Sequence, residues 1–143
     1  MRSTIRNSYL DLSAVAGNAE AMRLLGRIYE EGLGVDKNYA IAFYYYLNAA
    51  EQGISEAQVA VALLYKQGLG VAQDYIYTIY WLEKSVDNGN TIGKYNLALL
   101  YRYGEGVDQN LTFSFDLFSE AAASGDVNST YELAVMYESG LNN

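Results

Sequence analysis

Apolar residues recur along the chain at helical spacing, and the whole pattern repeats every 36 residues. The clearest copy runs from Ala21 to Gly53, and residues of the same kinds return one and two periods later. A turn with the pattern Tyr-x-x-Gly-x-Gly-Val begins at Tyr29, Tyr65 and Tyr101. A fixed period of this length, without drift, is typical of a solenoid of stacked helical units.

Apolar positions three and four residues apart predict helices, and the glycines between them predict where helices end. Each complete unit has a first helix, a glycine turn and a second helix, and such short connections make the two helices antiparallel neighbours. The predicted helices cover residues 3–16, 19–31, 39–52, 55–67, 75–88, 91–103, 111–124 and 127–139. The chain is therefore predicted to be one all-α solenoid over residues 1–143. Its full repeats are 18–53, 54–89 and 90–125, with a second-helix half-repeat at 1–17 and a first-helix half-repeat at 126–143.

Residues that occupy the same repeat position, 36 residues apart, form a column, and two such columns have a specific structural explanation. Asn38, with its counterparts Asp74 and Asn110, precedes a second helix and is predicted to cap it by accepting backbone N–H bonds. Gly26 lies inside a first helix, where glycine costs about 1 kcal/mol relative to alanine. Because its counterparts are all alanines, we expect a neighbouring helix to approach closely there. The tyrosines that open the turns are predicted to pack between helices.

The repeat resembles the Sel-one-like repeat, a relative of the tetratricopeptide repeat, because residues 21–35 follow its pattern A-x-x-x-L-G-x-x-Y-x-x-G-x-G-V. The resemblance covers essentially the whole chain. The chain departs from the family in lacking proline after the turn valine, and in having the family's tryptophan only once, as Trp81. The resemblance implies a right-handed superhelix of helix pairs that acts as an adaptor in protein complexes. Many such proteins are bacterial.

Charge and hydropathy exclude several classes of partner. The net charge is −8, from 17 acidic and 9 basic residues, without the Lys and Arg clusters that bind nucleic acid or an anionic membrane surface. No apolar run approaches the roughly 18 residues of a membrane helix. Residues 1–17 also lack the apolar core of a signal peptide. We therefore expect a soluble chain, with its compartment left open.

Catalytic chemistry has little support in the sequence. The chain contains no histidine and no cysteine, which excludes the usual general base, a thiol nucleophile and most transition-metal ligand sets. The adjacent Glu30 and Glu31 are interpreted as a solvated helix surface, with Arg27 and Glu31 forming an ion pair at i, i+4 spacing. The glycine turns lack the Lys and hydroxyl residues of a phosphate-binding loop. We predict a non-enzymatic protein that uses no cofactor and no metal.

The first helices carry a second column of residues, opposite the core, that changes from charged to aromatic and aliphatic along the chain. Exposed Tyr, Leu and Val beside an Arg have the composition of a binding hot spot, so we predict that this concave groove binds a partner protein or peptide. The predicted binding residues are Val59, Leu63, Tyr95, Leu99, Arg102, Tyr103, Tyr131 and Val135. In the alternative interpretation, this column packs against adjacent first helices.

Two other functions stay open. The half-repeats at the two ends are expected to leave apolar side chains without a covering helix, and head-to-tail stacking of molecules would cover them unless flanking repeats of a longer protein do so. The residues concerned are Ile5, Tyr9 and Leu10 at one end and Leu133, Val135, Met136 and Tyr137 at the other. A carbohydrate-binding or carbohydrate-active protein, using tyrosine stacking and carboxylates, is the second alternative.

Overall fold

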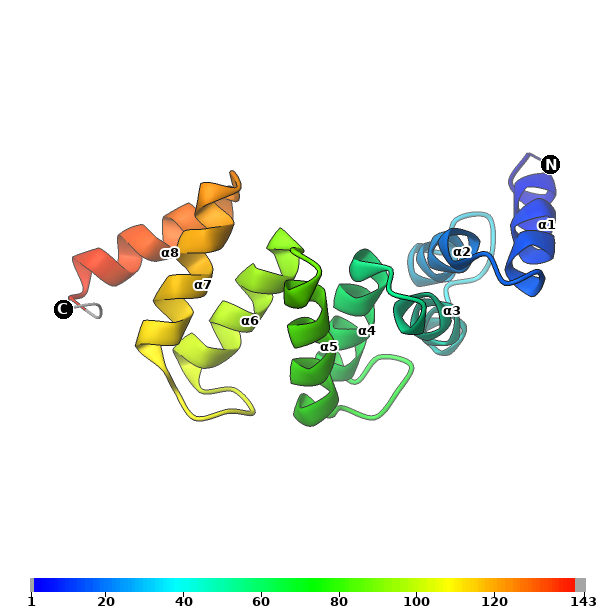
Figure 1. Cartoon of the computed structure of the whole chain (residues 1–143). Coiled ribbons are helices and arrows are strands. Elements are labelled where there is room, and N and C mark those ends of the chain that lie inside the picture. The colour runs from blue at the N-terminus through cyan, green and yellow to red at the C-terminus, as the bar shows by residue number, and fades with distance from the viewer. Residues whose placement is uncertain (1, 141–143) are drawn as a thin grey trace. The chain divides into compact units, whose positions relative to one another are not determined.

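The computed structural model describes residues 2–140, apart from the side chain of Ser3, and every regular element in this range is an α-helix (Figure 1). The helices are α1 (Arg2–Val15), α2 (Ala19–Glu31), α3 (Tyr39–Glu51), α4 (Ser55–Gln67), α5 (Tyr75–Asp87), α6 (Thr91–Tyr103), α7 (Leu111–Ala123) and α8 (Val127–Glu138). All the predicted helices are present, and each end agrees with the sequence within one residue. Because α2, α4, α6 and α8 begin 36 residues apart, the fold is the predicted all-α repeat solenoid.

The helices form two compact units, and the boundary between the units lies inside α5, between Trp81 and Leu82. In the first unit α1 packs on α2, α2 on α3, and α3 on α4. In the second unit α6 packs on α7, and α7 on α8. Each unit therefore builds its core from helices that follow one another in the sequence.

Polar side chains begin the helices, as the capping pattern predicts for the second helix of each repeat. Asn38 accepts the N–H of Ile41 and Asn110 that of Phe113, both at 3.0 Å. Asp74 accepts two backbone N–H groups, at 2.8 and 3.2 Å. Three of the first helices have caps of the same kind, which were not predicted from the sequence; these caps are Asn18, Asn90 and Asp126.

Gly26 lies where the second helix of its repeat comes closest to the first. A β-carbon at this position would be 2.7–2.9 Å from ring carbons of Tyr46, which is shorter than any ordinary contact between carbon atoms. The expectation of a close helix approach at Gly26 is therefore confirmed. The atom that approaches is part of a buried aromatic ring rather than backbone.

Gly70 places the turn of the second repeat against the beginning of α3. Its φ is +74°, and a β-carbon there would overlap the carbonyl group of Tyr39. Both the left-handed conformation and the backbone contact require glycine. The second glycine of the turn thus connects consecutive repeats, in addition to the turning role predicted for it.

The tyrosine column packs between helices, as predicted. The ring centroid of Tyr29 lies 6.1 Å from that of Tyr45 on α3, and the ring of Tyr101 lies 4.7 Å from that of Phe113 on α7. Tyr137 packs on α7 as well but stays mostly exposed. These aromatic contacts join first helices to second helices in both units.

One expectation about the chain's ends is wrong. Met136 was expected to be uncovered, yet its side chain is fully buried. It occupies the repeat phase of Ile28 and Leu100, which are buried core residues, so it belongs to the stripe that packs on the preceding second helix. Ile5 and Tyr9 are exposed, in agreement with the expectation for α1, whereas Leu10 is half-buried against the core between α1 and α2.

Candidate functional site

In the second unit, the predicted binding residues of α6 form a row along one face of the helix. Tyr95, Leu99 and Tyr103 are spaced four residues apart and therefore lie on the same side. Tyr103 is 57% exposed, whereas Tyr95 and Leu99 are half-buried. The ring of Tyr95 lies 5.9 Å from that of Phe118 on α7, so only part of this tyrosine is available to a partner.

A second row lies on α8, beside the first. Tyr131 is 66% exposed, and Val135, one turn further along, is half-buried. The two helices are joined by an ion pair in which Arg102 of α6 donates to Glu132 of α8. This ion pair brings α8 next to α6, and we call the two rows together the tyrosine surface, defined as Tyr95, Leu99, Tyr103, Tyr131 and Val135.

Arg102 does not lie open at the edge of this surface. Only 7% of the residue is exposed, and its guanidinium lies 5.1 Å from the ring centroid of Tyr103. Its burial follows from the ion pair, because a buried guanidinium needs an anionic partner and Glu132 supplies one. The structure thus gives Arg102 the role of connecting α6 to α8 and supporting Tyr103.

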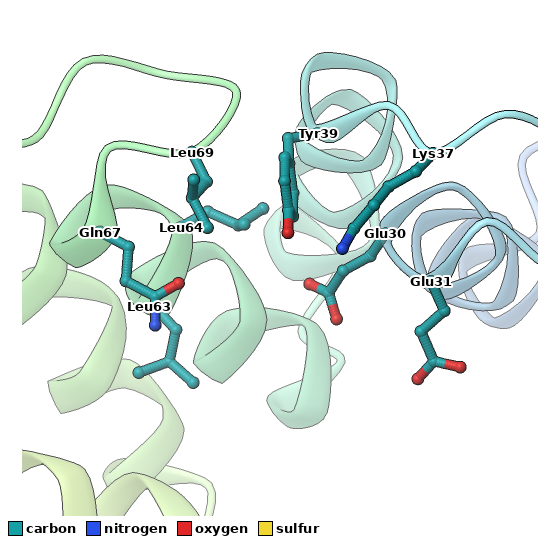
Figure 2. Close-up of a pocket in the computed structure, with 8 residues that line it drawn as sticks. All are labelled: Glu30, Glu31, Lys37, Tyr39, Leu63, Leu64, Gln67 and Leu69. Atoms are coloured by element: carbon teal, nitrogen blue, oxygen red, sulfur yellow. The ribbon is translucent and has the colours of Figure 1, made fainter.

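In the first unit, the two predicted residues of α4 are placed differently from each other. Val59 is buried, so its side chain belongs to the packing between helices, as the alternative interpretation of this column expects. Leu63 is half-buried and faces a cavity of about 520 Å³ (Figure 2). The cavity is lined by Glu30, Glu31, Lys37, Tyr39, Leu63, Leu64, Gln67 and Leu69.

The cavity has one polar wall and one largely apolar wall (Figure 2). The polar wall comes from the end of α2 and the beginning of α3, and there the ends of Glu30, Lys37 and Tyr39 point toward one another. The apolar wall comes from α4 and the turn after it, through Leu63 and other leucines.

The charged groups of the polar wall differ in how well they are paired. Glu31 accepts a hydrogen bond from Arg27 at 3.1 Å, which confirms the predicted surface ion pair. The ammonium of Lys37 lies 5.0 Å from the ring centroid of Tyr39, and a hydrogen bond with Tyr39 raises the pKa of this lysine. Glu30 forms no hydrogen bond or ion pair with any described residue. Burial, and then the nearby Glu31 carboxylate, raise the pKa of Glu30.

The cavity was not predicted from the sequence, although one position carried a signal for it. In the second and third repeats a glutamine follows the turn and donates to a carbonyl near the end of the first helix. Gln73 donates to Lys66 at 2.8 Å, and Gln109 donates to Arg102 at 2.7 Å. The first repeat has Lys37 at this phase, and Lys37 turns to Tyr39 instead.

A smaller cavity of about 280 Å³ lies between α1 and α2, and its lining is mostly apolar with Arg6 and Arg27 among the residues. Arg6 donates to the carbonyl of Leu33 at 3.2 Å and so holds α1 to the first turn. Among residues 2–140, no three His, Cys, Asp or Glu side chains gather in a way that could hold a metal ion. None of the described helices is long and apolar enough to cross a membrane.

The repeat pattern matches a known family over most of the chain. Residues 19–54, 55–90, 92–126 and 127–142 each match the Sel1 repeat, which is the Sel-one-like repeat that the sequence resembles. The chain belongs to the Sel1 repeat family. Members of this family are generally protein-interaction scaffolds. No curated protein matches the chain.

Solved structures of Sel1 repeat proteins are similar to this chain. The c5321 protective antigen of uropathogenic Escherichia coli is 33% identical, with a TM-score of 0.88 over 96% of this chain and 29% of that protein. A Sel1 repeat protein from Oxalobacter formigenes is 29% identical, with a TM-score of 0.84 over 93% of this chain and 55% of that protein. The Helicobacter pylori cysteine rich protein B, at 18% identity and a TM-score of 0.69 over 89% of this chain and 96% of that protein, shares the fold. This Sel1 chain therefore spans about a third of the length of the Escherichia coli protein and about half of the length of the Oxalobacter formigenes protein.

Proposed function

We propose that this Sel1 repeat protein is a non-enzymatic scaffold whose first helices bind a partner protein or peptide. The observation that carries the proposal is the tyrosine surface of the second unit. Tyr103 and Tyr131 expose more than half of their area on two helices that a buried ion pair joins. Tyrosine supplies a large contact area with few rotatable bonds, and such residues dominate many protein interfaces.

The side chains that hold Tyr103 in place also favour a binding role for this surface. Arg102 lies against the ring of Tyr103 and is itself fixed by Glu132, so little side-chain freedom is lost when a partner contacts this ring. The half-buried Leu99 and Val135 provide apolar contacts on the same helices. In the first unit, Leu63 is the predicted binding residue that remains accessible, through the cavity it lines.

The proposal is tested by selecting binders from a displayed random peptide library and titrating the best peptide against variants of the whole chain. Tyr103→Ala and Tyr131→Ala should each weaken binding by about 1–3 kcal/mol, because each removes a large side chain from the contact. Circular dichroism should show unchanged helicity. Tyr9→Ala is the matched control, since Tyr9 is equally exposed but lies on α1. Equal losses in all three variants would place the binding surface elsewhere.

Head-to-tail self-association is the second candidate, and exposed apolar residues of α1 and α8 favour it. Ile5, Tyr9 and Tyr137 each expose more than half of their area. A heterologous contact between these faces would give open chains of molecules. Light scattering over a concentration series tests this candidate, which predicts a mass that rises with concentration and falls again in a Tyr9→Ser, Tyr137→Ser variant. A constant monomer mass would eliminate it.

A further inference from the structure

The cavity of the first unit combines a wall of leucines with a half-buried carboxylate that forms no hydrogen bond or ion pair with any described residue, and this combination suits a particular kind of side chain. Its volume of about 520 Å³ lies within the range of about 300–1,000 Å³ that is typical of sites for small ligands. Figure 2 shows the polar ends of Glu30, Lys37 and Tyr39 on one side, and on the other the leucines Leu63, Leu64 and Leu69 together with the amide of Gln67. A ligand here would meet charge at one end and apolar surface along its length.

The charges of the cavity favour a cation over an anion. Glu31 is paired with Arg27, and the Lys37 ammonium is directed to Tyr39, whereas Glu30 has no hydrogen bond or ion pair of its own. Glu30 is also half-buried, and the nearby charges of Lys37 and Arg27 do not fully offset the cost of burying its ionised carboxylate. Lys37 is itself exposed and can turn toward solvent.

The apolar wall selects for a cation on an aliphatic stem. Lysine and arginine side chains combine a charged head with methylene groups that cover apolar surface. A small inorganic cation would leave the leucines without a contact. The repeat varies at this position, because the counterparts of Glu30 one, two and three periods later are Lys66, Arg102 and the exposed Glu138.

We propose that this cavity receives a lysine or arginine side chain of the partner polypeptide, with the cationic head at Glu30 and the aliphatic stem along Leu63 and Leu69. The inference deepens the scaffold function proposed above and rests on it. The raised pKa of Glu30 agrees with this role, because a bound cation would offset the cost of keeping this carboxylate ionised. Lys37 would move from the polar wall toward solvent when the basic side chain enters.

The cavity can be tested without knowing the partner, by titrating butylguanidinium into the whole chain and following leucine methyl groups by NMR. We expect saturable shifts of the Leu63 and Leu69 methyl signals. Butylurea has the same shape without the charge and should bind at least tenfold more weakly. Glu30→Gln should remove this difference between the two probes. Equal binding of both probes to the wild type would overturn the inference, as would stronger binding of pentanoate that depends on Lys37.

A second measurement separates this inference from the scaffold function. Each selected peptide that contains arginine is compared with its citrulline version, which keeps the shape and loses the charge. We expect citrulline to weaken binding to the wild type at least tenfold, and to make no difference to the Glu30→Gln variant. Peptides that lose affinity in Tyr103→Ala but tolerate citrulline would refute the basic-side-chain inference and leave the scaffold standing. A chain that selects no peptide at all would refute the scaffold.

Discussion

The end of α2 in the first unit and the end of α6 in the second unit use the same repeat positions in opposite ways. Glu30 and Arg102 are two periods apart and occupy the same place in their helices. Arg102 is buried, ion-paired with Glu132, and its carbonyl accepts a hydrogen bond from Gln109. Glu30 is half-buried, has no such partner, and lines a cavity.

The difference shows how the same repeat position can carry different side-chain chemistry on the same backbone. Caps and helix lengths are alike in both regions, because asparagines begin the second helices and glycines end the first ones. A charged residue at one surface phase can therefore be changed without disturbing the fold. In one unit this position holds an ion pair between neighbouring helices, and in the other it lines the cavity for which we propose a basic ligand.

The largest effect is expected on the stabilising side of the comparison. Glu132→Gln should lower the free energy of unfolding by about 3 kcal/mol, because it leaves the Arg102 guanidinium buried without a counter-charge. Urea denaturation measures this change. Glu120→Gln is the control in the same unit, since Glu120 forms an exposed ion pair with Lys94 and should cost less than about 1 kcal/mol.

The double variant Arg102→Met, Glu132→Leu adds a stricter test of the same interpretation. Replacing both charges by apolar side chains of similar volume should recover most of the lost stability, because no unpaired charge remains. If the double variant is as unstable as Glu132→Gln, the ion pair is not what governs stability at this contact.

The next largest effect on stability concerns Gly26 and its alanine counterparts in the other repeats. Gly26→Leu should destabilise the first unit by roughly 1–3 kcal/mol, because its side chain would occupy the space of the Tyr46 ring. Ala134→Leu makes a similar change at the same repeat phase in the second unit, where the residue is exposed. Its stability should stay within about 0.5 kcal/mol of the wild type. Equal melting temperatures for the wild type and Gly26→Leu would contradict the close contact.

The fold could be predicted from the sequence because its signals are local. A glycine that ends a helix and an asparagine that begins one act within a turn, so all the helix bounds were predicted within one residue. The tight contact at Gly26 was also predictable, since its counterparts never exceed alanine in size. These features repeat three or four times, and the repetition makes each of them recognisable in the sequence.

The site was less predictable because it depends on contacts between residues far apart in the chain. The burial of Arg102 depends on Glu132, 30 residues later, and the burial of Val59 depends on its neighbouring helices. The cavity likewise needs α2 and α4 to be placed beside each other. The available signal was the departure from the repeat, in which Lys37 differs in type from Gln73 and Gln109, and Glu30 from Lys66 and Arg102.

A charge reversal in the cavity should remove the ligand preference that distinguishes the two regions. Glu30→Lys gives the first repeat the residue that Lys66 gives the second, and it should weaken butylguanidinium binding by at least tenfold, about 1.4 kcal/mol. NMR titration measures this loss. Glu56→Lys changes the net charge equally from an exposed position of α4 that does not line the cavity, so it should have little effect. A similar loss in both variants would mean that only the overall charge matters.

The smallest effect is a change of stability with pH. Burial and the Glu31 carboxylate raise the pKa of Glu30 in the folded state above its ordinary value of 4.5. The folded protein therefore holds this proton more tightly than the unfolded chain, and stability falls as the pH rises through that range. Glu30→Gln removes the ionisation. The variant should be slightly more stable than the wild type at neutral pH, by less than about 0.5 kcal/mol, and the difference should vanish below pH 4.5.

Glu31→Gln is the matched control for this prediction, because it makes the same change at the adjacent residue. Glu31 is paired with Arg27, so its replacement removes an attractive contact and should cost a few tenths of a kcal/mol at neutral pH. The two neighbouring variants are thus expected to change the free energy of unfolding in opposite directions. Thermal unfolding at neutral and acidic pH measures both. If Glu30→Gln loses as much stability as Glu31→Gln, Glu30 already has a stabilising partner in the folded chain, and a bound cation would gain little by facing it.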